Sequence, residues 1–554
     1  MKKFRGNPLP LGISEQDGIV NISVAVGEGK KAFLCLYQRG DVSPKLRVEL
    51  PESEAVGDVR FLAFPKEQVD GFEYNYEIDG KLVLDPYARG AMETTSGPRG
   101  KICFDVYDWE DDVPLHIPYH DVIAYSLHVR GFTQSENSGV YGKGTFQGMI
   151  EKLPYLKDLG INQVQCMPIY AFWDNPKYRN YWGYGPGFYF TVNQQYGADP
   201  DAAKELKDMV KAYHKSGIEV VLHLPFTEGT SKMLILDCLR YYVIEYHVDG
   251  FVLNPYVAPM DCILSDPILG RTKILKHLDD FQNTMRQFLR GDVGMIPAVM
   301  WWLRQTTPES GSCNYMTRHT GFTLMDLVSY NEKHNEPNGE QNQDGPDENY
   351  SWNCGAEGPT RRKHVLTLRE QQRRNAMFLM MSAQGSPCIL AGDEFGNSQS
   401  GNNNVYCQDN ELAWLDWDDQ AREEMFFKYV KDLIALRKAY PILHQPTGLT
   451  GTDKTGIGVP DVSYHGAYAW QVSERKTNKQ LGVYYHGERN IDCYVAYNMH
   501  KKEQSFALPT LPKEKKWYQV FSTVDEQVAG KEHLVDNQKE IIIEGRTIVM
   551  LIGR

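Results

Sequence analysis

The sequence lacks three kinds of segment that would place it in a specialised class of protein. It has no Lys- or Arg-rich run and a net charge of -13, so nucleic acid and anionic membranes are not expected partners. No apolar run is long enough to cross a bilayer, and no apolar stretch follows the N-terminus as in a secretory signal. We therefore expect a cytoplasmic protein with no membrane segment.

The ten cysteines include no CxxC pair, which argues against a zinc site and against a disulfide framework. Several lie in apolar runs, as Cys35 and Cys388 do, which indicates buried free thiols in a reducing compartment. Two candidate ligands, His223 and Glu228, have no further His, Asp or Glu at ligand spacing. We expect neither a metal nor another cofactor.

What the sequence does contain is enough apolar material for several cores. With 554 residues and 42% hydrophobic content, three domains are expected. Residues 1–115 contain short alternating strand patterns and a hairpin turn at Asp79-Gly80, which predict an N-terminal β-sandwich. Residues 441–554 return to short β patterns and predict a C-terminal β-sandwich.

The middle of the chain, residues 116–440, alternates apolar strand patterns with helical patterns. Gly160 and Gly217 each stand between a helix and a strand, the order of βα units in a parallel sheet. Seven strands are predicted, at residues 122–129, 161–167, 219–224, 250–254, 272–276, 314–320 and 386–394. The fold class is therefore α/β, a (β/α)8-type barrel that is irregular at strands 5–6, because no confident sixth strand follows His277.

Several motifs resemble one glycoside hydrolase family over nearly the whole chain. They lie at residues 6–12, 84–88, 127–133, 180–184, 247–251, 319–335, 338–340, 351–355, 391–396, 401–404 and 406–410. Together they are similar to the isoamylase and glycogen-debranching branch of the α-amylase family. The resemblance implies a starch-binding-like N-terminal domain, an α-amylase-type TIM barrel, and an α-glucan such as glycogen, starch or branched dextrin as partner.

The residues at the family's catalytic positions depart from its pattern. They are Asn254 at the nucleophile, His277 at the acid/base, Thr320 at the third carboxylate, Val252 at the arginine, and His223 and Glu228 in the first motif. Retaining glycoside hydrolysis uses two carboxyl groups, and a carboxamide is a poor nucleophile. Losing one catalytic group already costs several orders of magnitude in rate. These departures from the family pattern therefore predict a pseudoenzyme: a member of the family that has no catalytic residues and is not an enzyme.

Three retained residues match sugar-binding positions of the family: Trp182, Tyr184 and His319. Tyr184 fits sugar stacking and loop packing equally well, and for His319 a structural hydrogen bond is favoured over a sugar contact. The loops at 228–236 and 277–281 are shorter than the resemblance implies, which predicts a shallower pocket, because such loops build the cleft of a barrel.

Three functions remain open from sequence. The first is an inactive member of the family that binds α-glucan or assists an active debranching or amylase homologue. The second is an active α-1,6-glucan debranching hydrolase with displaced carboxylates, for which Glu228, Asp249, Asp261, Asp279 and Asp280 are candidates. Asp249 is a poor one, since it precedes its strand. The third is a protein-interaction scaffold unrelated to sugar.

Overall fold

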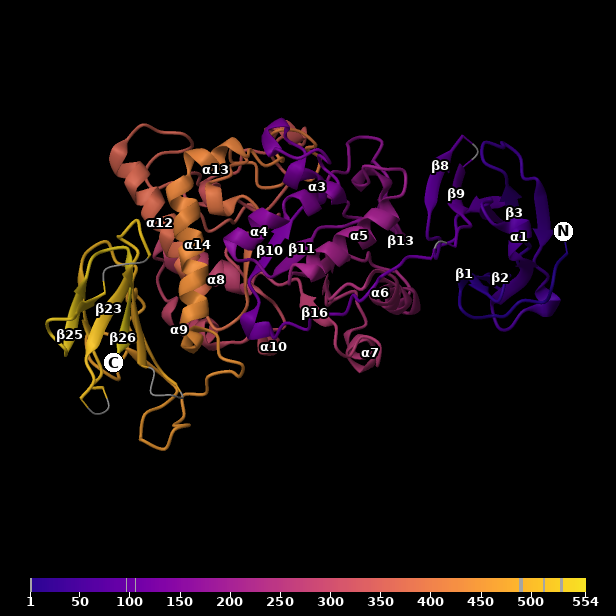
Figure 1. The fold of residues 1–554 in the computed structure, drawn as a ribbon. Coiled ribbons are helices and arrows are strands. Elements are labelled where there is room, and N and C mark those ends of the chain that lie inside the picture. The colour runs from indigo at the N-terminus through magenta and orange to yellow at the C-terminus, as the bar shows by residue number, and fades with distance from the viewer. Residues whose placement is uncertain (1, 96, 105, 488–491, 512–513, 529–531) are drawn as a thin grey trace.

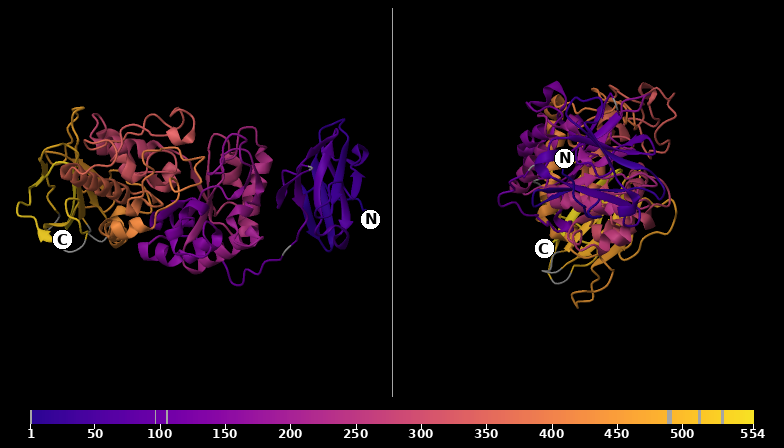
Figure 2. Two further views of the ribbon diagram at one scale, coloured as in Figure 1. Left: turned by 90° about the horizontal axis from the view of Figure 1, so that it is seen from above. Right: turned by 90° about the vertical axis from the view of Figure 1, so that its right-hand side faces the viewer.

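The computed structural model describes every residue of the chain except 1, 96, 105, 488–491, 512–513 and 529–531. Three bodies follow one another: a β-rich N-terminal part, a central barrel with its helices, and a β-rich C-terminal part (Figure 1). Figure 2 shows the N-terminal part at one end of the row and the C-terminal part at the other. Within the described residues, no helix combines the length and the apolar character that crossing a bilayer requires.

Two antiparallel sheets form the N-terminal part. One has the order β1 (Gly12–Gln16), β2 (Ile19–Ala25), β5 (Val59–Pro65); the other has the order β4 (Leu46–Glu49), β3 (Ala32–Tyr37), β6 (Glu73–Ile78), β9 (Gly97–Lys101), β8 (Ala91–Thr94), with β7 (Lys81–Val83) beside β6. Apolar side chains such as Ile22, Leu34 and Tyr76 fill the core. The predicted hairpin turn is present: Asp79 and Gly80 have φ of 49° and 77° and join β6 to β7.

One motif of the N-terminal part surrounds a buried carboxyl group. Asp85 is 1% exposed, and it accepts hydrogen bonds from Tyr74 Oη at 2.8 Å and from the Tyr87 amide at 2.9 Å. Burial nevertheless dominates and raises the pKa of this carboxyl from 3.8 to about 6. The folded chain therefore binds this proton more tightly than the unfolded chain.

This shift predicts a pH-dependent effect of Asp85→Asn. Because the folded-state pKa is raised, the wild type loses stability as pH rises from about 4 to about 6, and the loss is complete above that range. Asparagine mimics the protonated form and has no such loss. We expect the free energy of unfolding of the variant to gain roughly 2–3 kcal/mol on that of the wild type over this range. Urea unfolding of the wild type and the variant at several pH values measures this difference. If the free energies of unfolding of the two proteins changed with pH in parallel, the prediction would be wrong.

Seven parallel strands form a curled sheet with helices around it, which confirms the predicted barrel fold with β-rich flanking domains (Figure 1). In hydrogen-bonding order they are β16 (Lys273–Lys276), β15 (Gly250–Leu253), β14 (Glu219–His223), β11 (Gln163–Cys166), β10 (Ala124–Leu127), β18 (Pro387–Leu390) and β17 (Asn314–Tyr315). The surrounding helices include α4 (Leu153–Leu159), α5 (Ala202–Lys215), α6 (Lys232–Tyr246), α12 (Lys363–Ser382) and α14 (Glu424–Ala439). Gly160 and Gly217 follow α4 and α5 with φ of 97° and 75°, so each ends a helix as predicted.

The barrel wall is open between its fifth and seventh strands. β16 and β17 are the two edges of the sheet, and we call the gap between them the seam. The described residues 277–313 form α8 (Asp280–Arg290), α9 (Ile296–Arg304) and α10 (Thr307–Ser310) and contribute no strand. A backbone hydrogen bond from Lys276 N to Gly311 O, 2.7 Å long, crosses the seam. The missing sixth strand is therefore a break in the wall.

The strand predicted at 314–320 is shorter than expected, because side chains take its backbone groups. β17 ends at Tyr315, and the next carbonyl, Met316 O, accepts a hydrogen bond of 2.8 Å from Arg286 Nε in α8. The bond satisfies a carbonyl that a longer strand would pair within the sheet.

The C-terminal part contains two further antiparallel sheets. They are β19 (Val462–His465), β20 (Gln480–His486), β21 (Asp492–Asn498), β26 (Thr547–Gly553), β23 (Trp517–Ser522) and β24 (His533–Leu534), and separately β22 (Gln504–Ala507) with β25 (Glu540–Ile543). One of the short β patterns expected in this part, at residues 467–472, forms no strand and contains only an isolated bridge between Tyr468 and Gln471. We keep the domain boundaries after residues 115 and 440 as a proposal; the second directly follows α14.

Candidate functional site

The mouth of the barrel is the end at which its parallel strands finish. His223 is the last residue of β14, Asn254 follows β15, and His277 follows β16. His319 and Thr320 lie beyond the end of β17. Since carboxyl ends of parallel strands share one face of a barrel, these residues gather around that face.

His319 is the centre of the ring contacts at the mouth. Its imidazole lies 5.1 Å from the ring centroid of Trp182 and 5.2 Å from that of Tyr184. The rings of His277 and His223 follow at 5.8 Å and 6.0 Å. His319 and Trp182 are 6% exposed, and Tyr184 is half-buried. Aromatic residues predicted to bind sugar are thus packed around one histidine.

Burial keeps His223 and His319 uncharged. It lowers the pKa of His223 to about 3, and the nearby Arg318 guanidinium adds to this effect. Burial also holds the pKa of His319 well below its ordinary value, with smaller contributions from Arg318 and His223. The Nε2 atoms of both rings are buried without a hydrogen-bond partner in the described structure. Each ring therefore has unused hydrogen-bonding capacity.

Arg318 is a residue of the mouth that the sequence analysis missed. Its side chain is 3% exposed, and Nη1 donates to Leu278 O at 3.0 Å and to Asp279 Oδ1 at 2.6 Å. Burial lowers its pKa to about 10, so it remains a cation at neutral pH. The only signal in the sequence was an arginine inside an apolar strand pattern, directly before the histidine of a matched motif.

The other positions taken from the family pattern differ in their surroundings. Asn254 is exposed, and its Oδ1 accepts a hydrogen bond from the Tyr256 amide at 3.0 Å, so it stabilises a local turn. Thr320 and His277 are half-buried. Val252 is 3% exposed and packs in the barrel core, and Glu228 is exposed on a loop. The contacts in the described structure do not bring Glu228 or Val252 into the ring cluster.

Of the candidate displaced carboxylates, Asp279 is placed at the mouth by its contact with Arg318. Burial raises its pKa, and Arg286 partly offsets the effect. Asp249 lies at the opposite end of the barrel, where Oδ2 contacts His214 Nε2 at 2.9 Å beside a cavity of about 480 Å³. Asp279 is itself exposed, with 52% of its side chain accessible, as are Asp261 on α7 (Met260–Ser265) and Asp280 on α8. Asp279 is therefore the carboxyl group to consider for chemistry.

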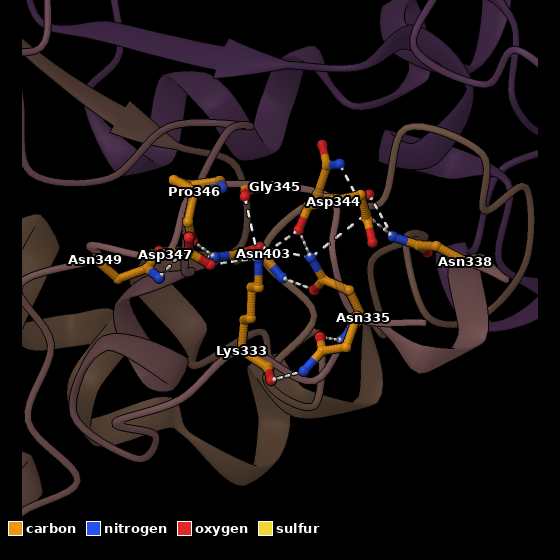
Figure 3. A network of polar contacts seen from close by, with 11 residues as sticks. Lys333, Asn335, Asn338, Asp344, Gly345, Pro346, Asp347, Asn349 and Asn403 are labelled. Carbon is orange, nitrogen blue, oxygen red and sulfur yellow. Dashed lines mark hydrogen bonds and ion pairs between the residues drawn. The ribbon is translucent and has the colours of Figure 1, made fainter. Parts of the chain in front are cut away.

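A network of polar contacts joins Asn403 to the segment 333–349 (Figure 3). Asn403 Nδ2 donates to Pro346 O at 2.8 Å and to Asn349 Oδ1 at 3.0 Å, and its backbone amide donates to Asn335 Oδ1 at 2.9 Å. Its carbonyl accepts from the amide of Gly321, which follows Thr320. The motifs at 319–335 and 401–404 thus hold each other in place.

No group of three or more His, Cys, Asp or Glu in the described residues has the arrangement of a metal site. His223 and Glu228 differ in burial, the first being enclosed and the second exposed. The groups described at the mouth include imidazole rings, the Arg318 guanidinium, the Thr320 hydroxyl and the Asp279 carboxyl group.

Comparison with known proteins places this chain in a family. A model described as the catalytic domain of alpha amylase matches residues 127–228. The chloroplastic isoamylase 3 of Oryza sativa subsp. japonica is 30% identical, covering 94% of this chain and 83% of its own length. The glycogen debranching enzyme of Erwinia tasmaniensis is 32% identical, covering 79% of this chain and 85% of its own.

Solved structures show the same fold at lower identity. The pullulanase type I of Bacillus subtilis, complexed with maltose, superposes with a TM-score of 0.76 at 18% identity, over 98% of this chain and 85% of that one. A GBS pullulanase complexed with maltotetraose superposes with a TM-score of 0.77 at 15% identity, over 99% and 88%.

These comparisons contradict the prediction that the chain is not an enzyme. The relatives carry the names of enzymes, isoamylase and glycogen debranching enzyme among them, and nothing in the comparisons indicates a loss of activity. The prediction equated replaced motif residues with lost chemistry, yet Asp279 and His277 stand at the same mouth. The chain belongs to the isoamylase and glycogen-debranching branch of the α-amylase family.

Proposed function

We propose that the chain binds branched α-glucan at the mouth of its barrel. The observation that carries the proposal is the ring cluster of Trp182, Tyr184 and His319. The ring centroid of His319 lies 5.1 Å from that of Trp182 and 5.2 Å from that of Tyr184. Aromatic rings present flat apolar faces to a sugar, and the unpartnered His319 Nε2 offers a hydrogen bond to a hydroxyl group. Two solved relatives of the same fold are described as complexes with maltose and maltotetraose.

A second candidate function is hydrolysis of α-1,6 branch linkages by displaced groups. The enzyme names of the relatives and the position of Asp279 favour it. In this proposal His277 donates a proton to the glycosidic oxygen while Asp279 accepts a proton from the attacking water. The water oxygen bonds to the anomeric carbon as the glycosidic C–O bond breaks, so that His277 ends as the neutral imidazole and Asp279 as the protonated carboxyl group. The raised pKa of Asp279 makes its carboxylate a stronger base than an aspartate of ordinary pKa.

Affinity electrophoresis in native gels containing glycogen tests binding. We expect the wild type to be retarded relative to a gel without glycogen. Absence of retardation would contradict the proposal and favour a protein-interaction platform. The partner to test would then be an active debranching or amylase homologue, by co-elution with the full-length chain.

Release of reducing ends from branched dextrin tests hydrolysis. If Asp279 acts as the base, Asp279→Asn lowers the rate by about two orders of magnitude or more, because general base catalysis typically contributes that much. Asp261→Asn is the matched control, since this carboxyl is exposed on α7. Equal rates for Asp279→Asn and the wild type would exclude Asp279, and the absence of turnover in the wild type would reject this reaction.

A further inference from the structure

Three buried polar atoms at the mouth have no hydrogen-bond partner in the described structure: Arg318 Nη2, His319 Nε2 and His223 Nε2. The three residues are 3%, 6% and 3% exposed, so bulk water does not replace the missing partners freely. A buried polar group without a partner destabilises the folded chain, and a charged one does so more strongly. Three such atoms in one region point to a ligand that supplies the missing contacts.

These atoms belong to side chains that lie close together. The rings of His223 and His319 are 6.0 Å apart, and Tyr184 Oη lies 3.5 Å from His223 Nδ1. Arg318 directly precedes His319 in the chain, and the effect of its charge on the pKa of both histidines agrees with a position near the two rings. The ligand would therefore meet one cation and two imidazoles at once.

The charge of the mouth favours an anion. Positions where the family pattern has carboxylates hold Asn254, His277 and Thr320, so their negative charges do not repel an anion. Arg318 has one acidic partner, Asp279 on Nη1, and Nη1 also donates to Leu278 O. Its Nη2 remains available, and guanidinium groups bind phosphate with well-directed, charge-assisted hydrogen bonds.

We propose that the mouth binds a glucose unit that carries a phosphate ester, with the phosphate on Arg318 and the sugar against the rings of Trp182 and Tyr184. The proposal rests on the proposed function, since it assigns the substrate class of the same site. The phosphate has two sources, a free sugar phosphate or a phosphorylated residue of an α-glucan chain. A neutral sugar offers only hydroxyl groups to Arg318 Nη2, whereas a phosphate offers a charged oxygen to this atom, which has no partner in the described structure.

Isothermal titration of the full-length chain separates these possibilities. The probes are glucose 6-phosphate, inorganic phosphate, glucose and maltotetraose, together with phosphorylated dextrin before and after phosphatase treatment. We expect glucose 6-phosphate to bind at least tenfold more tightly than glucose. Loss of dextrin affinity after phosphatase treatment identifies the chain-borne phosphate as the source, and an unchanged dextrin affinity identifies the free sugar phosphate.

Arg318→Gln is expected to reduce the affinity for glucose 6-phosphate at least tenfold, and to reduce it by a larger factor than the affinity for maltotetraose. Arg271→Gln is the matched control, because Arg271 lines the cavity at the other end of the barrel. Arg318 also contacts Leu278 and Asp279, so thermal unfolding of each variant is measured first. If Arg318→Gln does not fold, the wild type alone decides, through a larger rise in its Tm with glucose 6-phosphate than with glucose.

The outcomes distinguish this inference from the proposed function. Binding of maltotetraose without preference for the phosphorylated sugar overturns the inference and leaves the proposed function intact. Binding of glucose 6-phosphate without binding of maltotetraose rejects the proposed function. Phosphate binding that survives Arg318→Gln unchanged places the anion elsewhere on the chain and overturns the inference.

Discussion

His319→Ala is expected to weaken binding of maltotetraose on the order of a hundredfold, equivalent to about 3 kcal/mol. The imidazole lies 5.1 Å from the ring of Trp182 and 5.2 Å from that of Tyr184, so its removal leaves both proposed stacking surfaces without lateral support. The unpartnered Nε2 is lost as well. Titration calorimetry measures the affinity, and retardation in glycogen gels gives a second reading.

The control for this experiment is His364→Ala. His364 is exposed near the start of α12, so its removal changes the composition in the same way without touching the mouth. Truncating the buried His319 also costs folding stability, which requires both titrations to be made well below the Tm of the variant. An affinity for maltotetraose equal to that of the control would show that glucan does not bind at this cluster.

Arg437→Met is expected to lower the free energy of unfolding by about 5 kcal/mol or more, or to prevent folding. Arg437 on α14 is 1% exposed, and Nη1 donates to the carbonyls of Met381, Ala383 and Leu443 at 2.6, 2.7 and 3.1 Å. Nη2 donates to Gly385 O at 2.9 Å. Methionine fills much of the volume but leaves the buried carbonyls unpaired, at about 1–3 kcal/mol each.

Two comparison variants keep this prediction testable if the methionine variant does not fold. Arg437→Lys retains the charge and some donors, and an intermediate loss of stability is expected. Arg422→Met removes an exposed arginine whose side chain is 62% exposed, and a change within about 0.5 kcal/mol is expected. Urea unfolding measures all three. Equal losses for Arg437→Met and Arg422→Met would show that the buried bonds contribute little.

The parts of the fold that the sequence predicted well are those with local causes. Asp79-Gly80 forms a hairpin because both residues tolerate positive φ, and Gly160 ends its helix for the same reason. The end of β17 was not predictable in this way. It depends on Arg286, thirty residues earlier in the chain, reaching Met316 O.

The site shows the same division between local and distant causes. The motifs identified His319, Trp182 and Tyr184, and the structure brings their rings together. They also pointed to Glu228, which is exposed outside the ring cluster. Arg318 could not be identified from the sequence, because its partners Leu278 and Asp279 lie about forty residues earlier in the chain. No sequence pattern marks these two residues as its neighbours.

The seam has a mechanical consequence for the mouth. A closed barrel has hydrogen-bonded neighbours on both sides of every strand, whereas an open curled sheet separates most easily where its two edge strands face each other. His277 follows the edge strand β16, and His319 lies beyond the other edge strand, β17. The contacts of Arg318 with Leu278 and Asp279 connect the two sides of the seam. A ligand that contacts both histidines would add a further connection across the seam. We therefore expect ligand binding to make the barrel wall more rigid.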